Sequence, residues 1–280
     1  MFFSLVRIHQ WVKNFLILSN GIFLHQYSVF LNINLIYSFF SFCLIASSGY
    51  IINDLLDYKN ELNHPQKKMR PIQAKKISKI NAIYFSCILF ILANLLAIMI
   101  SINFTILINI YFILSVIYSF FFKKIFFIDI IFVSLMLFLR IFSGEYIYDI
   151  DTSIYLTLIS FTLFLTLLSL KRLSELRTSG NEYYKTKKYN EKNIFIIFYV
   201  SFLGSVLVLI YYFIFGDGKI FYKNNIIFFI ISSYTFWIIY LKNKANNGKI
   251  KVDPFLFCFK DLVSIIFGFF VLILIIFFGK

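Results

Sequence analysis

The sequence predicts an all-α protein, a polytopic membrane helical bundle of about nine membrane-spanning helices. Apolar residues make up 60% of the 280 residues, whereas about 45–50% is usual in soluble domains. These residues form long blocks separated by short polar clusters, and several blocks approach the roughly 20 residues that a helix needs to cross a bilayer. Strand-like alternation is absent, and a backbone in lipid must satisfy its own hydrogen bonds, so helix is favoured despite the 39 Phe residues.

The expected spans follow the apolar blocks in chain order. The first span contains Asn20, His25 and Gln26, so either its ends shift by several residues or it lies partly in the interface. No Pro-rich or Gly/Ser-rich linker divides the chain, and we therefore expect a single domain over residues 1–280. The spans are residues 14–31, 35–55, 80–100, 104–122, 126–145, 153–171, 193–215, 225–241 and 261–279.

Lys and Arg residues are unevenly distributed between the two sides of these spans. With the N-terminus in the cytoplasm, 23 of the 27 Lys and Arg residues fall in cytoplasmic segments, three fall on the opposite side, and Arg140 lies within a span. Cytoplasmic loops carry the excess of these residues in membrane proteins. The polar segments 53–79, 171–192 and 242–260 are therefore expected on the cytoplasmic side, and topology explains the net charge of +14 without nucleic acid binding.

An acidic cluster marks the cytoplasmic end of the second expected span. Asp54, Asp57 and Glu61 follow one another at spacings of three and four residues, which places their carboxylates on one face of a continued helix. Like charges so arranged repel, and a divalent cation between them would remove the repulsion; hard oxygen ligands suit Mg²⁺ bridging to phosphates. The alternative is a solvated helix end whose acids pair with nearby lysines.

Basic residues follow this cluster directly. Lys67 and Arg70 lie within reach of the same place, and Pro65 and Pro71 are expected to end the helix and stiffen the loop. Acids for a metal and bases for phosphate oxygens together make a diphosphate site. The alternative is that these cations only set the topology.

Arg172 and Glu175 form a second cytoplasmic cluster with Lys171 at the end of the sixth span. Their i,i+3 spacing allows an ion pair that stabilises the helix end. Two adjacent cations at a membrane edge equally suit a lipid phosphate or a second phosphate of a substrate. The sequence leaves both interpretations open.

Arg140 is the one cation expected inside a span, where a charge usually needs a partner or a polar cavity. Asp129 precedes it by about three helical turns, which is too far for a pair along the same helix. Arg140 therefore either serves a polar site or extends outward toward Glu145.

Several further residues have an ordinary interfacial alternative. Lys13 follows Trp11 ahead of the first span, and Tyr118 and Lys123 lie in the segment YSFFFKK. Tyr, Trp and Lys commonly anchor helices at the membrane surface. Each of these residues is thus a candidate for a polar site or simply an anchor.

The segment NDLLDYKNE resembles the first acidic motif, NDxxDxxxD, of the UbiA superfamily of intramembrane prenyltransferases. The resemblance implies a UbiA-like bundle of nine helices with a polar cavity facing the cytoplasm. Here Glu61 stands in place of the final Asp, which keeps the charge on a longer arm.

Within that superfamily the sequence resembles the decaprenyl-phosphate phosphoribosyltransferases. The similarity is carried, in order, by RIHQWVKN, the continuation HPQKKMRP, YSFFFKK followed by Asp129, LRIFSG, LKRLSEL and the late DP with Asp261. The aromatic prenyltransferases of the superfamily carry a second motif, DxxxD, where this chain has KRLSEL. One acidic and one basic motif suit one Mg²⁺-bound diphosphate and one lipid phosphate.

The resemblance implies a transferase that joins phosphoribosyl diphosphate (PRPP) to a polyprenyl phosphate in the bacterial inner membrane, facing the cytoplasm, for cell-envelope synthesis. Mg²⁺ is the implied cofactor, bound by Asp54, Asp57 and Glu61, which are also the implied catalytic residues. The alternatives are a prenyltransferase acting on an aromatic or other small acceptor, and a transporter or lipid-binding scaffold. The polyprenyl chain length and the oligomeric state, including a homo-oligomer, stay open. The residues expected to bind substrate are Lys13, Asn53, Lys67, Arg70, Tyr118, Lys123, Arg140, Lys171, Arg172 and Glu175.

Overall fold

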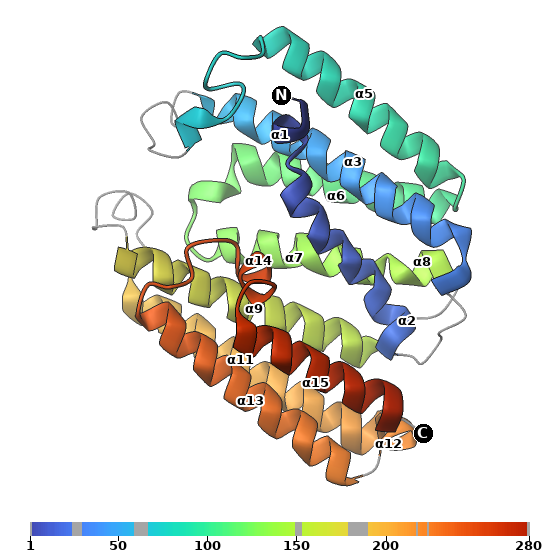
Figure 1. Cartoon of the computed structure of the whole chain (residues 1–280), viewed down its shortest axis with the longest axis vertical. Coiled ribbons are helices and arrows are strands. Elements are labelled where there is room, and N and C mark those ends of the chain that lie inside the picture. The colour runs from blue at the N-terminus through green and yellow to red at the C-terminus, as the bar shows by residue number, and fades with distance from the viewer. Residues whose placement is uncertain are drawn as a thin grey trace. The chain divides into compact units, whose positions relative to one another are not determined.

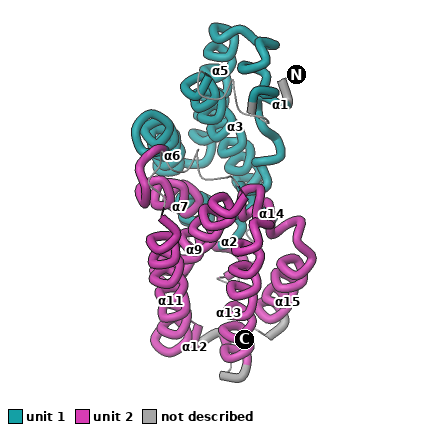
Figure 2. The backbone as a smooth tube through the Cα atoms, turned by 90° about the vertical axis from the view of Figure 1, so that its left-hand side faces the viewer, with its two compact units in different colours: residues 1–19, 28–123, 139–151 teal, residues 20–27, 124–138, 152–280 magenta. Residues whose placement is uncertain are grey.

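The computed structural model describes residues 2–23, 30–58, 67–148, 153–178, 190–216, 218–222 and 224–278. These residues form helices joined by turns and contain no strand, so the all-α prediction is confirmed (Figure 1). The chain divides into two compact units, shown in two colours in Figure 2. Unit 1 comprises Met1–Ser19, Ser28–Lys123 and Leu139–Asp151, and unit 2 comprises Asn20–Tyr27, Lys124–Phe138 and Thr152–Lys280. The prediction of one domain over residues 1–280 stays a prediction.

Unit 1 is built around α3 (Ile33–Leu56), which packs against α5 (Lys79–Ile98) and α6 (Ile102–Phe120). Small residues let these helices approach closely: the Ser41 hydroxyl donates to the Ala93 carbonyl (2.8 Å) and the Ser48 hydroxyl to the Ser86 carbonyl (2.9 Å). The other elements with residues in this unit are α1 (Phe2–Val6), the 3₁₀ helices η1 (Ile8–Leu18), η3 (Lys67–Met69) and η4 (Phe122–Lys124), the end of α7 (Ile128–Phe142), and α8 (Gly144–Tyr148).

Unit 2 is built on α9 (Ile154–Thr178), which packs against α11 (Glu191–Phe215) and α13 (Asn224–Asn246). Fully buried side chains such as Leu170, Leu173 and Ile238 form its core. Buried hydroxyls pair between helices, since Thr166 donates to Ser201 at 2.9 Å. The remaining elements are the start of α7, α2 (Ser19–Phe23, its first residue in unit 1), α12 (Gly218–Phe221), α14 (Pro254–Cys258) and α15 (Leu262–Phe278).

Seven helices of the described residues are long and apolar enough to cross a membrane. Many of their large apolar side chains are exposed, for example Ile80, Ile91 and Leu95 on α5, as expected of helices that face lipid. The chain is therefore an integral membrane protein. The seven segments are Ile33–Leu56, Lys79–Ile98, Ile102–Phe120, Ile128–Tyr148, Ile154–Thr178, Glu191–Phe215 and Ile226–Asn246.

The predicted number of about nine spans is not confirmed within the described residues. In the first expected span, residues 14–18 belong to the 3₁₀ helix η1 and residues 19–23 to the short helix α2. The reason is chemical: Asn14 and Asn20 are buried polar residues in this segment, and such residues favour packing against protein over facing lipid. The last expected span, α15, has 17 residues and is shorter than the other seven.

Candidate functional site

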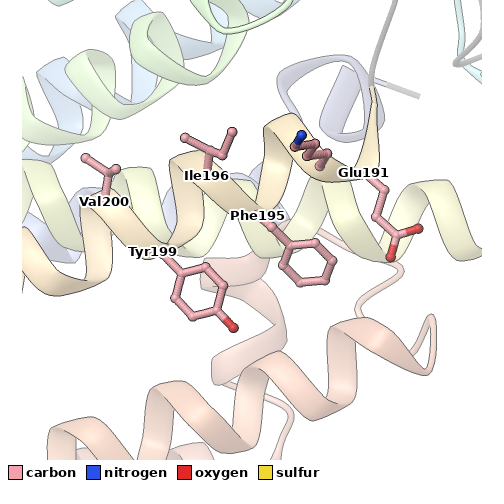
Figure 3. Close-up of a pocket in the computed structure, with 6 residues that line it drawn as sticks. Glu191, Phe195, Ile196, Tyr199 and Val200 are labelled. Atoms are coloured by element: carbon pink, nitrogen blue, oxygen red, sulfur yellow. The ribbon is translucent and has the colours of Figure 1, made fainter.

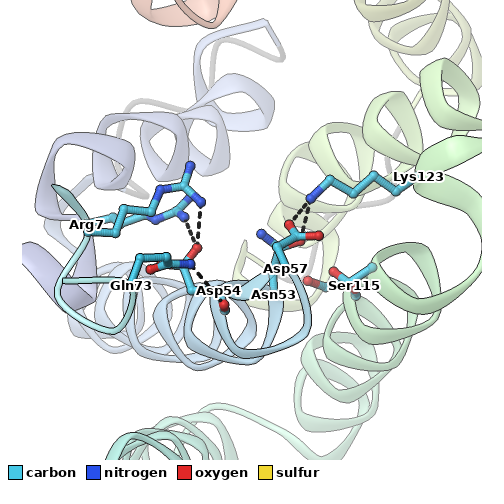
Figure 4. Close-up of polar contacts among 9 residues, drawn as sticks. Arg7, Asn53, Asp54, Asp57, Gln73, Ser115 and Lys123 are labelled. Atoms are coloured by element: carbon cyan, nitrogen blue, oxygen red, sulfur yellow. Dashed lines mark hydrogen bonds and ion pairs between the residues drawn. The ribbon is translucent and has the colours of Figure 1, made fainter. Parts of the chain in front are cut away.

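Two acidic residues of unit 1, Asp54 and Asp57, lie at the C-terminal end of α3 (Figure 4). Asn53 and Asp54 occupy the last turn, and Asp57 follows directly, its amide donating to the Asn53 carbonyl at 2.9 Å. The side chains of Asp54 and Asp57 are only 5% and 13% exposed. Buried carboxylates are stable only with charged or hydrogen-bonding partners, and the structure provides cations for both.

Asp54 is held by two guanidinium groups from different parts of the chain. Arg70 donates to Asp54 Oδ1 at 2.8 Å, and Arg7 forms an ion pair with the same oxygen. Gln73 Nε2 also donates to the Asp54 backbone carbonyl at 3.1 Å. Arg70 was expected at this position, whereas Arg7 and Gln73 were missed. A single carboxylate oxygen thus faces two positive charges.

Asp57 is paired with Lys123, which lies in η4 after α6. The Lys123 ammonium also donates to the Asn53 side-chain oxygen at 3.1 Å. The structure thereby brings together three predicted residues, Asn53, Asp57 and Lys123, which are up to 70 positions apart in sequence. In Figure 4, Lys123 approaches Asp57 from the side of α3 opposite to Arg7.

The oxygen donors of this cluster suit a hard divalent cation. Two carboxylates and the Asn53 amide oxygen are ligand types that Mg²⁺ accepts, with the remaining positions filled by water and substrate phosphates. The described residues contain no group of three His, Cys, Asp or Glu side chains that could hold a metal. The expected third ligand, Glu61, lies outside the described residues. The described donors therefore fit a metal that is shared with a phosphate ligand.

Lys67 and Tyr118 are the other predicted site residues of the first cytoplasmic segments. Lys67 begins η3, but its side chain lies outside the described part. Tyr118 is half-buried in the last turn of α6.

Arg140 lies in the interior of unit 1 and is 2% exposed. Its Nε donates to Asn14 Oδ1 at 2.8 Å and its terminal nitrogen to the Tyr111 hydroxyl at 2.7 Å. The alternative of an Arg140 side chain extending outward is therefore wrong, because neutral oxygen acceptors on neighbouring segments satisfy it inside the protein. Lys13, beside Asn14, is also buried, at 8% exposed, so it is not a simple surface anchor.

The charged cluster of unit 2 is centred on Arg172. One terminal nitrogen contacts Asp129 at 2.7 Å and the other contacts Glu175 at 2.6 Å. The expected i,i+3 ion pair is thus present. Asp129, whose side chain is 0% exposed, is a partner that helical spacing alone did not reveal. Lys171 is 3.8 Å from Glu175 and 23% exposed, which leaves it more accessible to an anion than Arg172 at 13%.

Asp261 precedes α15 and forms a polar network in unit 2. It accepts hydrogen bonds from the Tyr240 hydroxyl (2.9 Å) and from the Ser264 hydroxyl (2.9 Å), and Lys244 lies 3.7 Å away. Burial alone raises the pKa of the Asp261 carboxyl, but these hydrogen bonds and the Lys244 charge outweigh it and lower that pKa below its ordinary value. The network stabilises the start of α15.

A shallow groove lies on the surface of α11 in unit 2 (Figure 3). All six of its lining residues come from this single helix, and most of them are apolar. Such a surface is expected of a helix that faces lipid. The residues are Glu191, Lys192, Phe195, Ile196, Tyr199 and Val200.

Comparison with known proteins identifies the relatives of this chain. The sequence profile of the UbiA prenyltransferase family matches residues 15–260. The nodulation protein NoeC of Azorhizobium caulinodans is 26% identical, with 93% of this chain and 87% of that protein covered. A decaprenyl-phosphate phosphoribosyltransferase of Mycolicibacterium smegmatis is 29% identical over 65% of this chain and 59% of that protein.

Solved structures share the fold. A UbiA homologue from Archaeoglobus fulgidus bound to GPP and Mg²⁺ has a TM-score of 0.73 at 18% identity, covering 99% of this chain and 96% of that chain. The structure of the same homologue with DMAPP and Mg²⁺ also has a TM-score of 0.73, at 18% identity, with 98% of each chain covered. The predicted UbiA-like fold is therefore confirmed.

Proposed function

Because the chain belongs to the UbiA prenyltransferase family, we propose that it is a Mg²⁺-dependent transferase that joins PRPP to a polyprenyl phosphate. The reaction releases diphosphate and yields a polyprenyl-phosphoryl-5-phosphoribose, a lipid-linked sugar for cell-envelope synthesis. The observation that carries the proposal is the cluster of Arg7, Arg70 and Lys123 around Asp54 and Asp57. Three cations and two acids fit a diphosphate with its metal.

Each side chain of this cluster has a role that follows from its charge. Asp54 and Asp57, with Asn53 and Glu61, would hold Mg²⁺, which as a Lewis acid stabilises negative charge on the departing diphosphate. Arg70 and Lys123 would turn from the carboxylates toward the phosphate oxygens and neutralise them. The chain itself thus provides the orientation and the charge compensation that a diphosphate leaving group requires.

The acceptor needs little activation, because a lipid phosphate is already anionic at neutral pH. The work of the protein is then to hold this phosphate in line with the anomeric carbon of the ribose. Considered within unit 2 alone, Lys171 and Arg172 stay predicted phosphate-binding residues, and Lys171 is the more accessible of the two because Arg172 is bound between Asp129 and Glu175. Lys13, Tyr118 and Arg140 remain candidates for positioning the substrate.

The resemblance to the phosphoribosyltransferases supports PRPP as the donor. The M. smegmatis relative bears that activity in its name and is 29% identical over 65% of this chain. The excess of Lys and Arg in the predicted cytoplasmic segments supports a reaction on the cytoplasmic face of the bacterial inner membrane.

A second candidate is a prenyltransferase that moves a prenyl group onto an aromatic or other small acceptor. It is favoured by the solved structures of the same fold, which hold GPP or DMAPP with Mg²⁺. PRPP and the prenyl diphosphates all carry a diphosphate, so the unit 1 cluster suits either kind of donor. The two candidate functions differ in the acceptor.

The deciding experiment incubates the purified protein in lipid nanodiscs with labelled PRPP, polyprenyl phosphate and Mg²⁺. We expect labelled lipid-linked phosphoribose, which disappears when EDTA removes the metal. A parallel reaction contains a prenyl diphosphate and an aromatic acid. Product from this second reaction alone would reverse the ranking. The Glu191→Gln variant, which alters an exposed ion pair with Arg177, serves as the matched control.

A further inference from the structure

Lys242 lies near the C-terminal end of α13, and its ammonium group is held among aromatic side chains of α11. Its Nζ donates to the Tyr199 hydroxyl at 2.6 Å and lies 5.8 Å from the ring centroids of both Phe195 and Phe198. Among the residues that the structure describes, no carboxylate forms an ion pair with Lys242, and these aromatic groups are its polar and charge partners. The ammonium is thus fixed in place while its charge is not neutralised.

Tyr199 contributes a second hydrogen-bond donor beside this charge. A phenol oxygen that accepts a hydrogen bond keeps its own O–H to donate, and within the described residues no acceptor contacts that O–H. Tyr199 is 45% exposed, and in Figure 3 its hydroxyl points away from α11. An ammonium has three N–H donors, so the N–H groups that Lys242 retains and the Tyr199 O–H are adjacent donors that suit phosphate oxygens.

The charges around this end of α11 favour an anion. Glu191 lines the groove beside Tyr199, but its carboxylate forms an ion pair with Arg177. Lys192 also lines the groove and is exposed. The Lys and Arg distribution predicts this end of the helix on the cytoplasmic side, where the anionic lipids of a membrane attract basic residues.

An exposed apolar stripe continues along α11 from Tyr199. Leu203, Leu207 and Ile214 are exposed, and their spacing from Tyr199 places all four side chains on one side of the helix. The stripe is about 22 Å long, which exceeds the roughly 15 Å of hydrocarbon in one leaflet of a bilayer. A positively charged end followed by an apolar stripe of this length matches the head group and the acyl chain of an anionic lipid.

We infer that Lys242 and Tyr199 form a head-group site for an anionic phospholipid of the surrounding bilayer, whose acyl chain lies along the α11 stripe. The lipid phosphate accepts hydrogen bonds from the Lys242 ammonium and the Tyr199 hydroxyl, and the aromatic rings keep the ammonium in position. A Lys that only anchored the helix would extend into water rather than pack among rings. The site shares no residue with the proposed diphosphate site and does not depend on the proposed reaction.

The test measures the lipids bound to the full-length protein in detergent by native mass spectrometry. Dioleoyl-phosphatidylglycerol is compared with dioleoyl-phosphatidylcholine, which has the same acyl chains and a zwitterionic head group. We expect the wild type to bind the first phosphatidylglycerol about 10-fold more tightly, and Lys242→Gln to lose this preference, because a charge-assisted hydrogen bond is lost. Tyr199→Phe keeps the ring but removes one donor, so it should weaken phosphatidylglycerol binding about 5-fold.

Matched controls remove the same groups elsewhere in unit 2. Lys251→Gln removes an exposed cation from the segment after α13, and Tyr211→Phe removes the hydroxyl of an exposed Tyr farther along α11. Both variants should keep the wild-type preference, and so should Lys242→Arg, which retains the charge. Thermal unfolding establishes that each variant is folded, and Tyr199→Phe carries the test if Lys242→Gln is not.

Three outcomes overturn the inference. An equal loss of preference in Lys251→Gln would mean that only the total charge of the protein attracts anionic lipid. A preference that survives in Lys242→Gln would mean that phosphatidylglycerol binds elsewhere. Binding that depends on Lys242 for inorganic phosphate or for polyprenyl phosphate, but not for phosphatidylglycerol, would assign the site to a free anion or to the acceptor lipid.

Discussion

Replacing Asp54 by Asn separates the observed role of this carboxylate, which is to pair with two guanidinium groups, from its proposed role as a metal ligand. In the protein, Arg7 and Arg70 both contact Asp54 Oδ1. Removing one partner of a fully buried ion pair costs about 3–5 kcal/mol. Because the two Arg side chains keep 16% and 25% of their surface exposed, we expect the smaller loss of about 2 kcal/mol in the free energy of unfolding.

The catalytic effect of Asp54→Asn should exceed its effect on stability. A neutral amide is a poor ligand for a hard cation, and loss of the metal-bound leaving-group stabilisation should lower kcat/KM about 10³-fold, or about 4 kcal/mol. The assay is phosphoribosyl transfer from labelled PRPP at several Mg²⁺ concentrations, with Glu191→Gln as the control. The Mg²⁺ concentration at half-maximal rate should rise in the Asn variant.

One result would refute this reasoning. A folded Asp54→Asn protein that keeps more than a tenth of the wild-type rate, with an unchanged Mg²⁺ dependence, would show that Asp54 does not hold the metal. An Asn variant that loses stability by about 2 kcal/mol but retains activity would assign Asp54 a purely structural role.

Three other perturbations probe the cluster and the scaffold. Lys123→Met should raise the KM for PRPP about 10-fold in steady-state assays, because a phosphate-neutralising charge is lost. Gly248→Ala should lower the free energy of unfolding by about 2 kcal/mol in thermal denaturation, because Gly248 has φ +65° and an added Cβ would lie 2.6 Å from Thr178 Cγ2. Asp261 has a pKa below its ordinary value of 3.8, so its stabilisation is complete above that value and is lost as the pH falls further. The wild-type unfolding temperature should therefore decrease more than that of Asp261→Asn between about pH 5 and about pH 3.

Local sequence features predicted the helices and the position of the acids. A span of apolar residues that ends in NDLLD fixes Asp54 and Asp57 at a helix end, since both the span length and the i,i+3 spacing are properties of a single segment. The same holds for the Arg172–Glu175 pair, which lies within one helix. Seven of the expected spans are found as long apolar helices for this reason.

Contacts between residues that are far apart in sequence could not be predicted from the pattern of a single segment. Arg7 and Asp54 are 47 residues apart, and Arg140 and Asn14 are 126 residues apart, so no periodicity connects them. The signal that could have found Arg7 is its place in RIHQWVKN, one of the segments that carry the resemblance to the phosphoribosyltransferases. For Asp129, the signal was the cost of an acid beside a membrane span, which requires a cation from another helix.

The cations of unit 1 and the proposed metal would both offset the repulsion between the carboxylates of Asp54 and Asp57. Side chains three residues apart on a helix lie about 5–6 Å from each other, and two carboxylates at that distance repel by about 3 kcal/mol at an effective dielectric constant of 20. Arg7, Arg70 and Lys123 offset this repulsion when no ligand is bound. A divalent ion offsets it equally well, but it must displace these cations, and a diphosphate then gives them a new anion. Under the proposed function, the metal and the diphosphate would therefore stabilise each other's binding. A site that favours the metal-diphosphate complex over either component suits the proposed enzyme, whose donor carries a metal-bound diphosphate.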